Sequence, residues 1–145
     1  MILVDEQGTQ RLGAALAQVL QPRDVVTLSG PLGAGKTTLV RALLQALGEK
    51  GEIPSPSFAL VQPYNELSPP VWHADLYRVE HPGELDELGL DDIRHDGVLL
   101  VEWPERAGVA AWPDALALSR EPLAGEARRL TAKAPASWEG RWPLP

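Results

Sequence analysis

The chain has 145 residues, of which 44% are hydrophobic and 23% charged, a composition typical of an ordinary folded domain and unlike disordered or coiled-coil proteins. Its formal net charge of -7 disfavours direct binding of a polyphosphate unless a basic patch or a partner is present. The absence of cysteine excludes disulfides, thiolate metal sites and cysteine nucleophiles. We expect one domain over residues 1–134 and an irregular, proline-rich C-terminal tail over residues 135–145.

The N-terminal sequence MILVDEQGTQ and the distribution of apolar residues bear on localisation. The chain turns acidic and polar by position 5, without the basic region and the long apolar region of a signal peptide. No run of about 18 apolar residues, the length that a membrane span requires, occurs in the sequence. We therefore expect a cytoplasmic protein with no membrane partner.

The first part of the chain predicts a helix, a strand and a second helix. Apolar residues recur with helical spacing over residues 5–21, where Asp5 is available as the N-cap. The run Val25–Ser29 is short and rich in β-branched residues, which predicts a buried strand. A second stripe of helical spacing covers residues 39–47. The order strand, glycine loop, helix is therefore expected around residue 30.

The rest of the chain predicts mainly strands. Apolar or alternating runs of strand length occur at residues 58–64, 71–77, 98–101, 115–119 and 127–133. The turn NELSPP makes the first pair antiparallel neighbours, and EPLAGE is the predicted turn between the last pair. Residues 82–95 predict one or two short acidic helical turns.

The segment between the first strand and the second helix matches the phosphate-binding loop pattern G-x-x-x-x-G-K-S/T. It reads Gly30-Pro31-Leu32-Gly33-Ala34-Gly35-Lys36-Thr37. Its glycines let backbone N–H groups approach phosphate oxygens, and the following helix N-terminus adds partial positive charge. Lys36 can reach the β- and γ-phosphates, and the Thr37 hydroxyl can ligate Mg²⁺. Because a strand precedes the loop and a helix follows it, we favour a phosphate site over a simple glycine turn.

A phosphate loop needs an acid at the end of another buried strand to hold Mg²⁺. Glu102 follows the apolar run VLLV and has that placement, while Asp75 is the competitor. Strand alternation puts His73, Asp75 and Tyr77 on one face. For either acid the alternative is a solvated strand end, and His73 is predicted to be a hydrogen-bonded packing residue rather than a ligand or base. The three histidines lack the spacing of a zinc site.

Four sequence blocks together resemble the TsaE (YjeE) family. The blocks GPLGAGKTTL, SPSF, HADLYR and VEWPE occur in the family's order and spacing within residues 5–110. The resemblance implies an α/β fold of the P-loop NTPase type, with a parallel core, antiparallel additions and flanking helices. It also implies a P-loop ATPase that uses ATP and Mg²⁺ in the synthesis of threonylcarbamoyladenosine at adenosine 37 of ANN-decoding tRNAs. Its implied partners are TsaD and TsaB, with tRNA contacted indirectly through that complex.

The family's functional residues carry over position by position. The implied nucleotide-binding residues are Gly33, Ala34, Gly35, Lys36, Thr37, Thr38 and Arg128. The implied metal ligands are Thr37 and Glu102, and the implied catalytic residues are Asp75, Lys36 and Glu102, with Asp75 near the γ-phosphate. The implied switch or partner-contacting residues are Ser55, Pro56, Ser57, Phe58 and Trp103.

The chain departs from the family pattern at Pro31 and Ser57. The family commonly has an acid after the first loop glycine, where this chain has Pro31, and it usually reads SPTF where this chain has Ser57. Pro31 removes a backbone donor outside the GAGKT core, and Ser57 keeps the hydroxyl. We therefore expect nucleotide binding to survive both changes.

Three other functional classes compete with a free-standing ATPase. A GTPase needs an N/T-K-x-D element to bind guanine, and none of the three lysines lies in one. A small-molecule kinase needs an arginine-rich lid, whereas the arginines here are scattered. A nucleotide-gated binding module, which hydrolyses ATP slowly or only within a complex, remains compatible with the family resemblance. In the tail, Trp138 and Trp142 either form a docking patch or pack onto the body of the protein.

Overall fold

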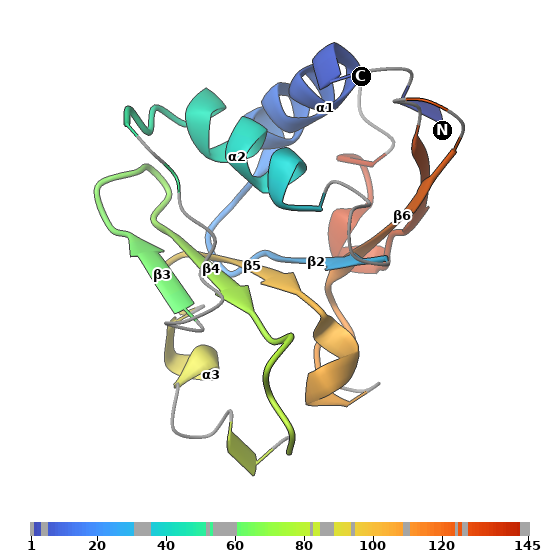
Figure 1. Ribbon diagram of the computed structural model, residues 1–145. Coiled ribbons are helices and arrows are strands. Elements are labelled where there is room, and N and C mark those ends of the chain that lie inside the picture. Colours follow the sequence, from blue (N-terminus) through green and yellow to red (C-terminus); the bar gives the residue numbers. More distant parts are fainter. Residues whose placement is uncertain are drawn as a thin grey trace.

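Seven strands form one mixed sheet in the order β1-β7-β6-β2-β5-β4-β3 (Figure 1). The computed structural model describes residues 2–3, 6–30, 36–51, 53, 61–81, 83–84, 89–93, 95–108, 111–123, 125 and 128–142. The strands are Ile2–Leu3 (β1), Val25–Ser29 (β2), Val61–Tyr64 (β3), Val71–Asp75 (β4), Val98–Glu102 (β5), Leu116–Pro122 (β6) and Arg128–Lys133 (β7). Strands β6, β2, β5 and β4 are parallel, whereas β3, β7 and β1 join antiparallel. The expected fold class, a parallel core with antiparallel additions, is confirmed.

Helices cover both faces of this sheet. They are α1 (Glu6–Val19), α2 (Lys36–Ala46), α3 (Leu90–Ile93) and the 3₁₀ helices η2 (Pro104–Ala107) and η3 (Ala136–Trp138). Helices α1 and α2 lie side by side on one face, while α3 lies on the other (Figure 1). Among the described helices, none is both long and apolar enough to cross a membrane.

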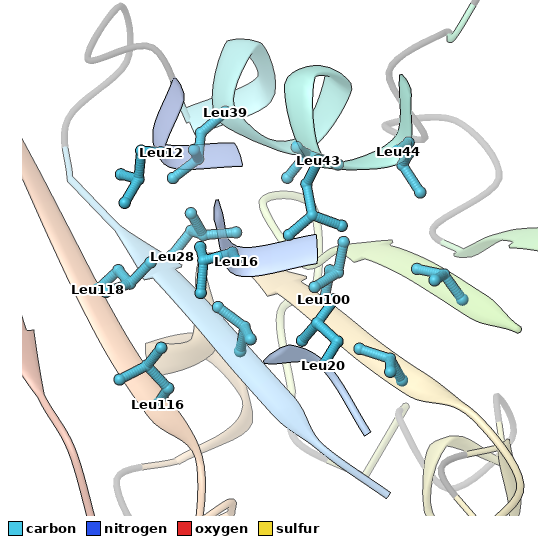
Figure 2. Packing of buried hydrophobic residues seen from close by; sticks show 14 of the residues in the cluster. Leu12, Leu16, Leu20, Leu28, Leu39, Leu43, Leu44, Leu100, Leu116 and Leu118 are labelled. Atoms are coloured by element: carbon cyan, nitrogen blue, oxygen red, sulfur yellow. The ribbon is translucent and has the colours of Figure 1, made fainter. Parts of the chain in front are cut away.

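The central strand β5 is buried on both faces because it contributes to two apolar clusters. Leu100 packs with leucines of α1 and α2, as Figure 2 shows, whereas Leu99 and Val101 belong to the cluster on the opposite face. Each buried leucine side chain contributes about 2 kcal/mol through the apolar surface that it removes from water. Glu102 continues the Leu100 side of the strand by alternation, so it lies on the face that α1 and α2 cover.

Pairing with neighbouring strands sets several boundaries differently from the local pattern. The antiparallel pairing of β3 with β4 is confirmed, but residues 58–60 of the predicted strand lie outside the described residues. Strand β4 ends at Asp75, so Tyr77 lies beyond it. Strand β6 extends to Pro122 because it pairs with β7 through that residue, which corrects the predicted start of the EPLAGE turn. Strand β1 was not expected, since a strand of two residues carries no periodicity.

Polar groups also lie within the core on the α1 and α2 face. Burial raises the pKa of the Tyr64 phenol, with a further upward contribution from Glu49 and an opposing one from Arg41. Arg120 of β6 is 2% exposed, and its guanidinium donates to the Thr9 hydroxyl of α1 at 3.1 Å. Buried polar groups of this kind need such partners because their desolvation is costly.

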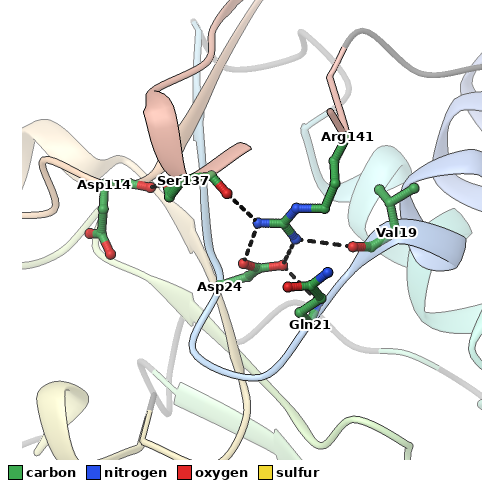
Figure 3. A network of polar contacts seen from close by, with 6 residues as sticks. All are labelled: Val19, Gln21, Asp24, Asp114, Ser137 and Arg141. Atoms are coloured by element: carbon green, nitrogen blue, oxygen red, sulfur yellow. Dashed lines mark hydrogen bonds and ion pairs between the residues drawn. The ribbon is translucent and has the colours of Figure 1, made fainter. Parts of the chain in front are cut away.

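The C-terminal tail packs on the body of the protein. Trp138 in η3 is 1% exposed and belongs to the same cluster as the leucines of α1 and α2, and Trp142 is half-buried against it. Arg141 reaches back to Asp24 at the start of β2, with a contact of 2.6 Å between Nη1 and Oδ2 (Figure 3). Trp138 therefore packs onto the body of the protein and does not form an exposed docking patch.

Candidate functional site

The candidate site lies where the carboxyl ends of β2, β5 and β4 meet. Glu102 at the end of β5 is in register with Leu28 of β2 on one side and with Asp75 of β4 on the other. Strand β2 ends at Ser29, and α2 begins at Lys36. Parallel strands share their carboxyl edge, and ligands of open α/β sheets bind there. The sequence-predicted acids and the start of α2 are thus brought to one edge of the sheet.

The phosphate-loop residues fall partly within the described structure. Lys36 and Thr37 occupy the first turn of α2, and Thr38 in that turn is half-buried. Residues 31–35, which include Gly33, Ala34 and Gly35, lie outside the described residues. The first turn of a helix presents unpaired N–H groups and partial positive charge, both of which favour an anionic ligand.

Glu102 is almost completely enclosed, with 2% of its surface exposed. His73 of β4 is fully buried, and its Nε2 lies 2.6 Å from Oε2 of Glu102. A buried carboxylate without such a contact would lose its hydration without compensation. The predicted interpretation of His73 as a hydrogen-bonded packing residue is confirmed, and its partner is the candidate metal acid.

Asp75 is 6% exposed and is held by its own chain. Its Oδ1 accepts a hydrogen bond from the backbone N–H of Tyr77 at 3.0 Å, a local turn of the kind that aspartate favours. The backbone N–H of Leu76 donates to the carbonyl of Glu102 at 3.0 Å, which keeps the two chains together just past the end of β4. The Asp75 carboxyl is thus bonded to its own chain at the point where Asp75 is in register with Glu102.

Trp103 sits directly after Glu102 and turns the chain sharply. It has left-handed backbone angles, φ 60° and ψ 49°, which residues other than glycine adopt rarely and which often occur at functional sites. Its ring centroid lies 5.0 Å from that of Tyr77 at a tilt of 50°, and the Arg106 guanidinium lies 6.0 Å from the Tyr77 centroid. Tyr77 is 40% exposed, so this aromatic pair borders the site at the protein surface.

Of the remaining predicted site residues, Arg128 lies within the described part of the chain. Arg128 begins β7 and pairs with Pro122 at the end of β6, so its backbone lies at the same edge of the sheet as the carboxyl end of β2. The switch candidates Ser55, Pro56, Ser57 and Phe58 lie outside the described residues.

The donor chemistry at this edge suits a hard divalent cation bound together with a phosphate. Carboxylate oxygens of Glu102 and Asp75 and the hydroxyl of Thr37 are oxygen donors, which Mg²⁺ prefers. Across the described ranges, no three histidine, cysteine or acidic side chains gather closely enough to form a complete protein cage for a metal. Mg²⁺ usually takes one or two protein oxygens and completes its shell with phosphate and water, so the residues present fit Mg²⁺ with ATP.

The sequence pattern missed two contacts at the site. Alternation placed His73 and Asp75 on one face, but nothing in the pattern showed that β4 adjoins β5, which the His73–Glu102 contact requires. The pairing of Tyr77 with Trp103 depends on the same adjacency. All these residues belong to the HADLYR and VEWPE blocks. The occurrence of both blocks in one chain was therefore the sequence feature that could have indicated these contacts.

Comparison with known protein families agrees with this geometry. The family model described as "Threonylcarbamoyl adenosine biosynthesis protein TsaE" matches residues 3–130. The chain belongs to the TsaE family. That family takes part in the biosynthesis of threonylcarbamoyladenosine in tRNA.

Individual TsaE proteins resemble the chain over most of its length. A relative from Rickettsia felis, described as "tRNA threonylcarbamoyladenosine biosynthesis protein TsaE", is 42% identical over 106 residues, which cover 72% of this chain and 62% of the relative. The Haemophilus influenzae protein of the same description is 39% identical over 117 residues, covering 77% of this chain and 73% of that protein. The chain spans 62% and 59% of the lengths of the relatives from Rickettsia felis and Rickettsia conorii.

A solved structure shows the same fold. The crystal structure of Bacillus subtilis YdiB superposes with a TM-score of 0.77 at 31% sequence identity. The superposition covers 92% of this chain and 83% of YdiB.

Proposed function

We propose that this TsaE-family chain binds ATP with Mg²⁺ and hydrolyses it, and that this cycle governs its association with a TsaD–TsaB complex during the threonylcarbamoylation of adenosine 37 in ANN-decoding tRNAs. The observation that carries the proposal is the register of Asp75 with Glu102 at the sheet edge where α2 begins. Acids beside the start of such a helix can hold Mg²⁺ and orient the attacking water, two functions that recur in nucleotide hydrolysis. The absence of a guanine-binding N/T-K-x-D element favours ATP.

The phosphates of ATP bind to the loop and the first turn of α2. Backbone N–H groups of residues 33–38 donate to phosphate oxygens, and the Lys36 ammonium pairs with the β- and γ-phosphates. Thr37 and Glu102 hold Mg²⁺, which when bound neutralises part of the phosphate charge. Arg128, at the same edge, is assigned to the nucleotide through the family resemblance.

Hydrolysis needs a group that orients water toward the γ-phosphorus. Asp75 is suited to this role because its carboxyl is fixed by the Tyr77 N–H and lies beside Glu102. The water oxygen forms a bond to the γ-phosphorus, the bond from that phosphorus to the β,γ-bridging oxygen breaks, and ADP and inorganic phosphate leave. Lys36 stabilises the charge that develops on the phosphate oxygens during this step.

The charge of the chain favours a nucleotide-gated subunit of a complex over a free-standing enzyme that binds tRNA itself. With a formal net charge of -7, the chain repels the tRNA backbone, so tRNA is contacted through the partner complex. We accordingly expect slow hydrolysis by the isolated chain and faster hydrolysis with TsaD–TsaB in the cytoplasm, where tRNA is modified.

Reconstitution tests this function. Purified chain is mixed with TsaD–TsaB, an ANN-decoding tRNA, ATP and a threonylcarbamoyl donor, and modified nucleoside is measured by mass spectrometry together with released phosphate. We expect product only when the chain and ATP are both present, and faster phosphate release in the full mixture than from the chain alone. Equal product without the chain would contradict the proposal.

The switch residues give a prediction about partner binding. Ser55 and Ser57 precede the Asp75 strand in sequence, and loops in this position are ordered by the γ-phosphate in other P-loop proteins. A nucleotide shifts an association equilibrium only by its difference in affinity for the two states. We expect the affinity for TsaD–TsaB to differ between an ATP analogue and ADP, and deletion of residues 55–57 to remove that difference while nucleotide binding persists. Equal affinities of the unaltered chain in both nucleotide states would refute the switch.

A further inference from the structure

We propose that His73 is a positioning residue for the magnesium site, which holds the Glu102 carboxylate in the orientation that a Mg²⁺–nucleotide complex requires. The inference rests on the proposed function, because it takes Glu102 as a ligand of Mg²⁺. It adds to the proposed site a residue of β4 whose imidazole is fully buried.

The contact itself is short and enclosed. His73 Nε2 and Glu102 Oε2 lie 2.6 Å apart, and the two side chains are 0% and 3% exposed. An ionised carboxylate only accepts hydrogen bonds, so Nε2 carries the hydrogen and donates it. A short hydrogen bond to a carboxylate is directional and stronger than one between neutral groups. It commits one oxygen of Glu102 to β4 and thereby restricts rotation of the carboxylate plane.

The sheet gives this contact a rigid frame. Asp75 is in register with Glu102, and His73 lies two residues earlier on the same face of β4. The imidazole therefore reaches diagonally across to the end of the adjacent strand, a distance that long side chains on neighbouring strands can span. Strands β4 and β5 are bonded along five register pairs, so the relative position of the two residues is fixed by backbone pairing.

Within the described structure, the His73 imidazole forms a hydrogen bond to the Glu102 carboxylate alone. Its second nitrogen, Nδ1, has no hydrogen-bond partner among the residues that the structure describes. His73 is thus not a link in a longer polar network there, and its polar contribution is directed at Glu102. Groups that orient a metal ligand in this way typically change metal affinity about 10- to 100-fold when they are removed.

A purely stabilising role makes a different prediction. A buried carboxylate needs a partner in any case, so loss of His73 lowers the stability of the fold under either interpretation. A stabilising role alone would affect nucleotide binding equally with and without Mg²⁺. A positioning role weakens only the part of binding that depends on Mg²⁺.

Calorimetric titration separates these outcomes. A non-hydrolysable ATP analogue is titrated into the full chain over a series of Mg²⁺ concentrations and in EDTA. We expect His73→Leu to lower the Mg²⁺ affinity of the protein–nucleotide complex about 10- to 100-fold while binding in EDTA stays at the wild-type level. His73→Gln places an amide N–H near the Nε2 position, so it should recover most of the affinity. The matched control is His81→Leu, at an exposed histidine outside the site, which should behave as the wild type.

Each result decides a different claim. Full Mg²⁺ dependence of binding in the wild type and an unchanged dependence in His73→Leu would overturn the positioning role alone. Wild-type binding that does not respond to Mg²⁺ would overturn the proposed function, and this inference with it. If His73→Leu does not fold, His73→Asn replaces it, because its shorter amide cannot reach Glu102. Equal Mg²⁺ affinities for His73→Gln and His73→Asn would then refute the inference.

Discussion

Asp75 and Glu102 are neighbours in register, yet their local environments differ. Glu102 is engaged by an imidazole from within the sheet, whereas Asp75 is held by a backbone N–H at the point where its strand ends. Two carboxylates in different surroundings can have different chemical roles in one site. Under the proposed function, Glu102 would hold the metal and Asp75 would orient the attacking water.

Single amide substitutions test that division. Glu102→Gln should weaken the Mg²⁺ dependence of ATP binding, because an amide is a poorer ligand than a carboxylate. Asp75→Asn should leave ADP binding intact and lower the hydrolysis rate about 100-fold, as loss of a group that orients or deprotonates water does. Binding is measured by calorimetry and turnover by phosphate release.

A matched control for both variants is Glu105→Gln, at an exposed acid in η2 close to Glu102 in sequence. It should match the wild type in both assays. If Glu102→Gln and Asp75→Asn behave alike in binding and in hydrolysis, the assigned division of labour is wrong.

The sequence predicted on which strands His73, Asp75 and Glu102 lie, but not how their side chains meet. Alternation within HADLYR put His73 and Asp75 on one face, and the buried run VLLV predicted an acid at the strand end. The hydrogen bond from His73 to Glu102 depends on β4 lying next to β5, a long-range pairing that local patterns do not encode. The sequence thus predicted the strand positions of these side chains but not their contacts.

Helices α1 and α2 approach closely enough to require glycine at one contact. A Cβ added to Gly13 of α1 would lie 2.7 Å from the Cβ of Ala42 and 2.8 Å from the backbone nitrogen of Leu43, both in α2. These contacts are too short to persist, and backbone atoms cannot rotate away as a flexible side chain could. Because α2 begins at Lys36, the packing of α1 also positions the start of the helix that we propose binds phosphate.

Gly13→Ala therefore tests the helix contact through the sign of its effect. In an unconstrained helix interior this change stabilises by about 0.5 to 1 kcal/mol. Here we expect it to lower the free energy of unfolding by about 1 to 3 kcal/mol, because overpacking forces the helices apart. Urea denaturation measures the change, and calorimetry should show weaker ATP binding as α2 shifts. A stabilised variant would contradict the close helix contact.

Local sequence patterns predicted the helices more accurately than the ends of the strands. Helical stripes predicted α1 and α2 because they repeat over several turns, whereas strand ends followed their partners. Strand β6 continues through Glu121 and Pro122, residues that disfavour a strand, because β7 pairs with it along that length. Tertiary pairing overrode a weak local preference there.

The C-terminal tail belongs to the folded body and not to its periphery. Arg141 forms a two-pronged contact with Asp24, from Nη1 at 2.6 Å and from Nη2 at 3.0 Å, and also donates to the carbonyls of Val19 and Ser137 (Figure 3). Its guanidinium also lies 4.1 Å from the centroid of the buried Trp138 ring. The proline-rich composition of the tail did not reveal this arrangement, because Asp24 and Val19, which receive three of these hydrogen bonds, lie more than 100 residues away along the chain.

Arg141→Met should lower the free energy of unfolding by about 2 kcal/mol, because it leaves the mostly buried Asp24 carboxylate without its charged partner. For a protein of this size that loss corresponds to a fall in Tm of about 6 °C in calorimetry. Arg11→Met, at an exposed arginine of α1, is the control and should change Tm little. A Tm for Arg141→Met equal to that of the control would show that the tail does not stabilise the body.

Isothermal calorimetry with ATP and Mg²⁺ most directly tests whether the molecule binds ATP through the start of α2, as proposed. Three proteins are compared: the wild type, Lys36→Ala, and Lys50→Ala as a control at an exposed lysine beyond the C-terminal end of α2. Lys36 is the cation that the loop motif sets against the phosphates, so its loss should abolish measurable binding, while Lys50→Ala binds ATP as the wild type does. Wild-type affinity retained in Lys36→Ala would contradict ATP binding through the start of α2.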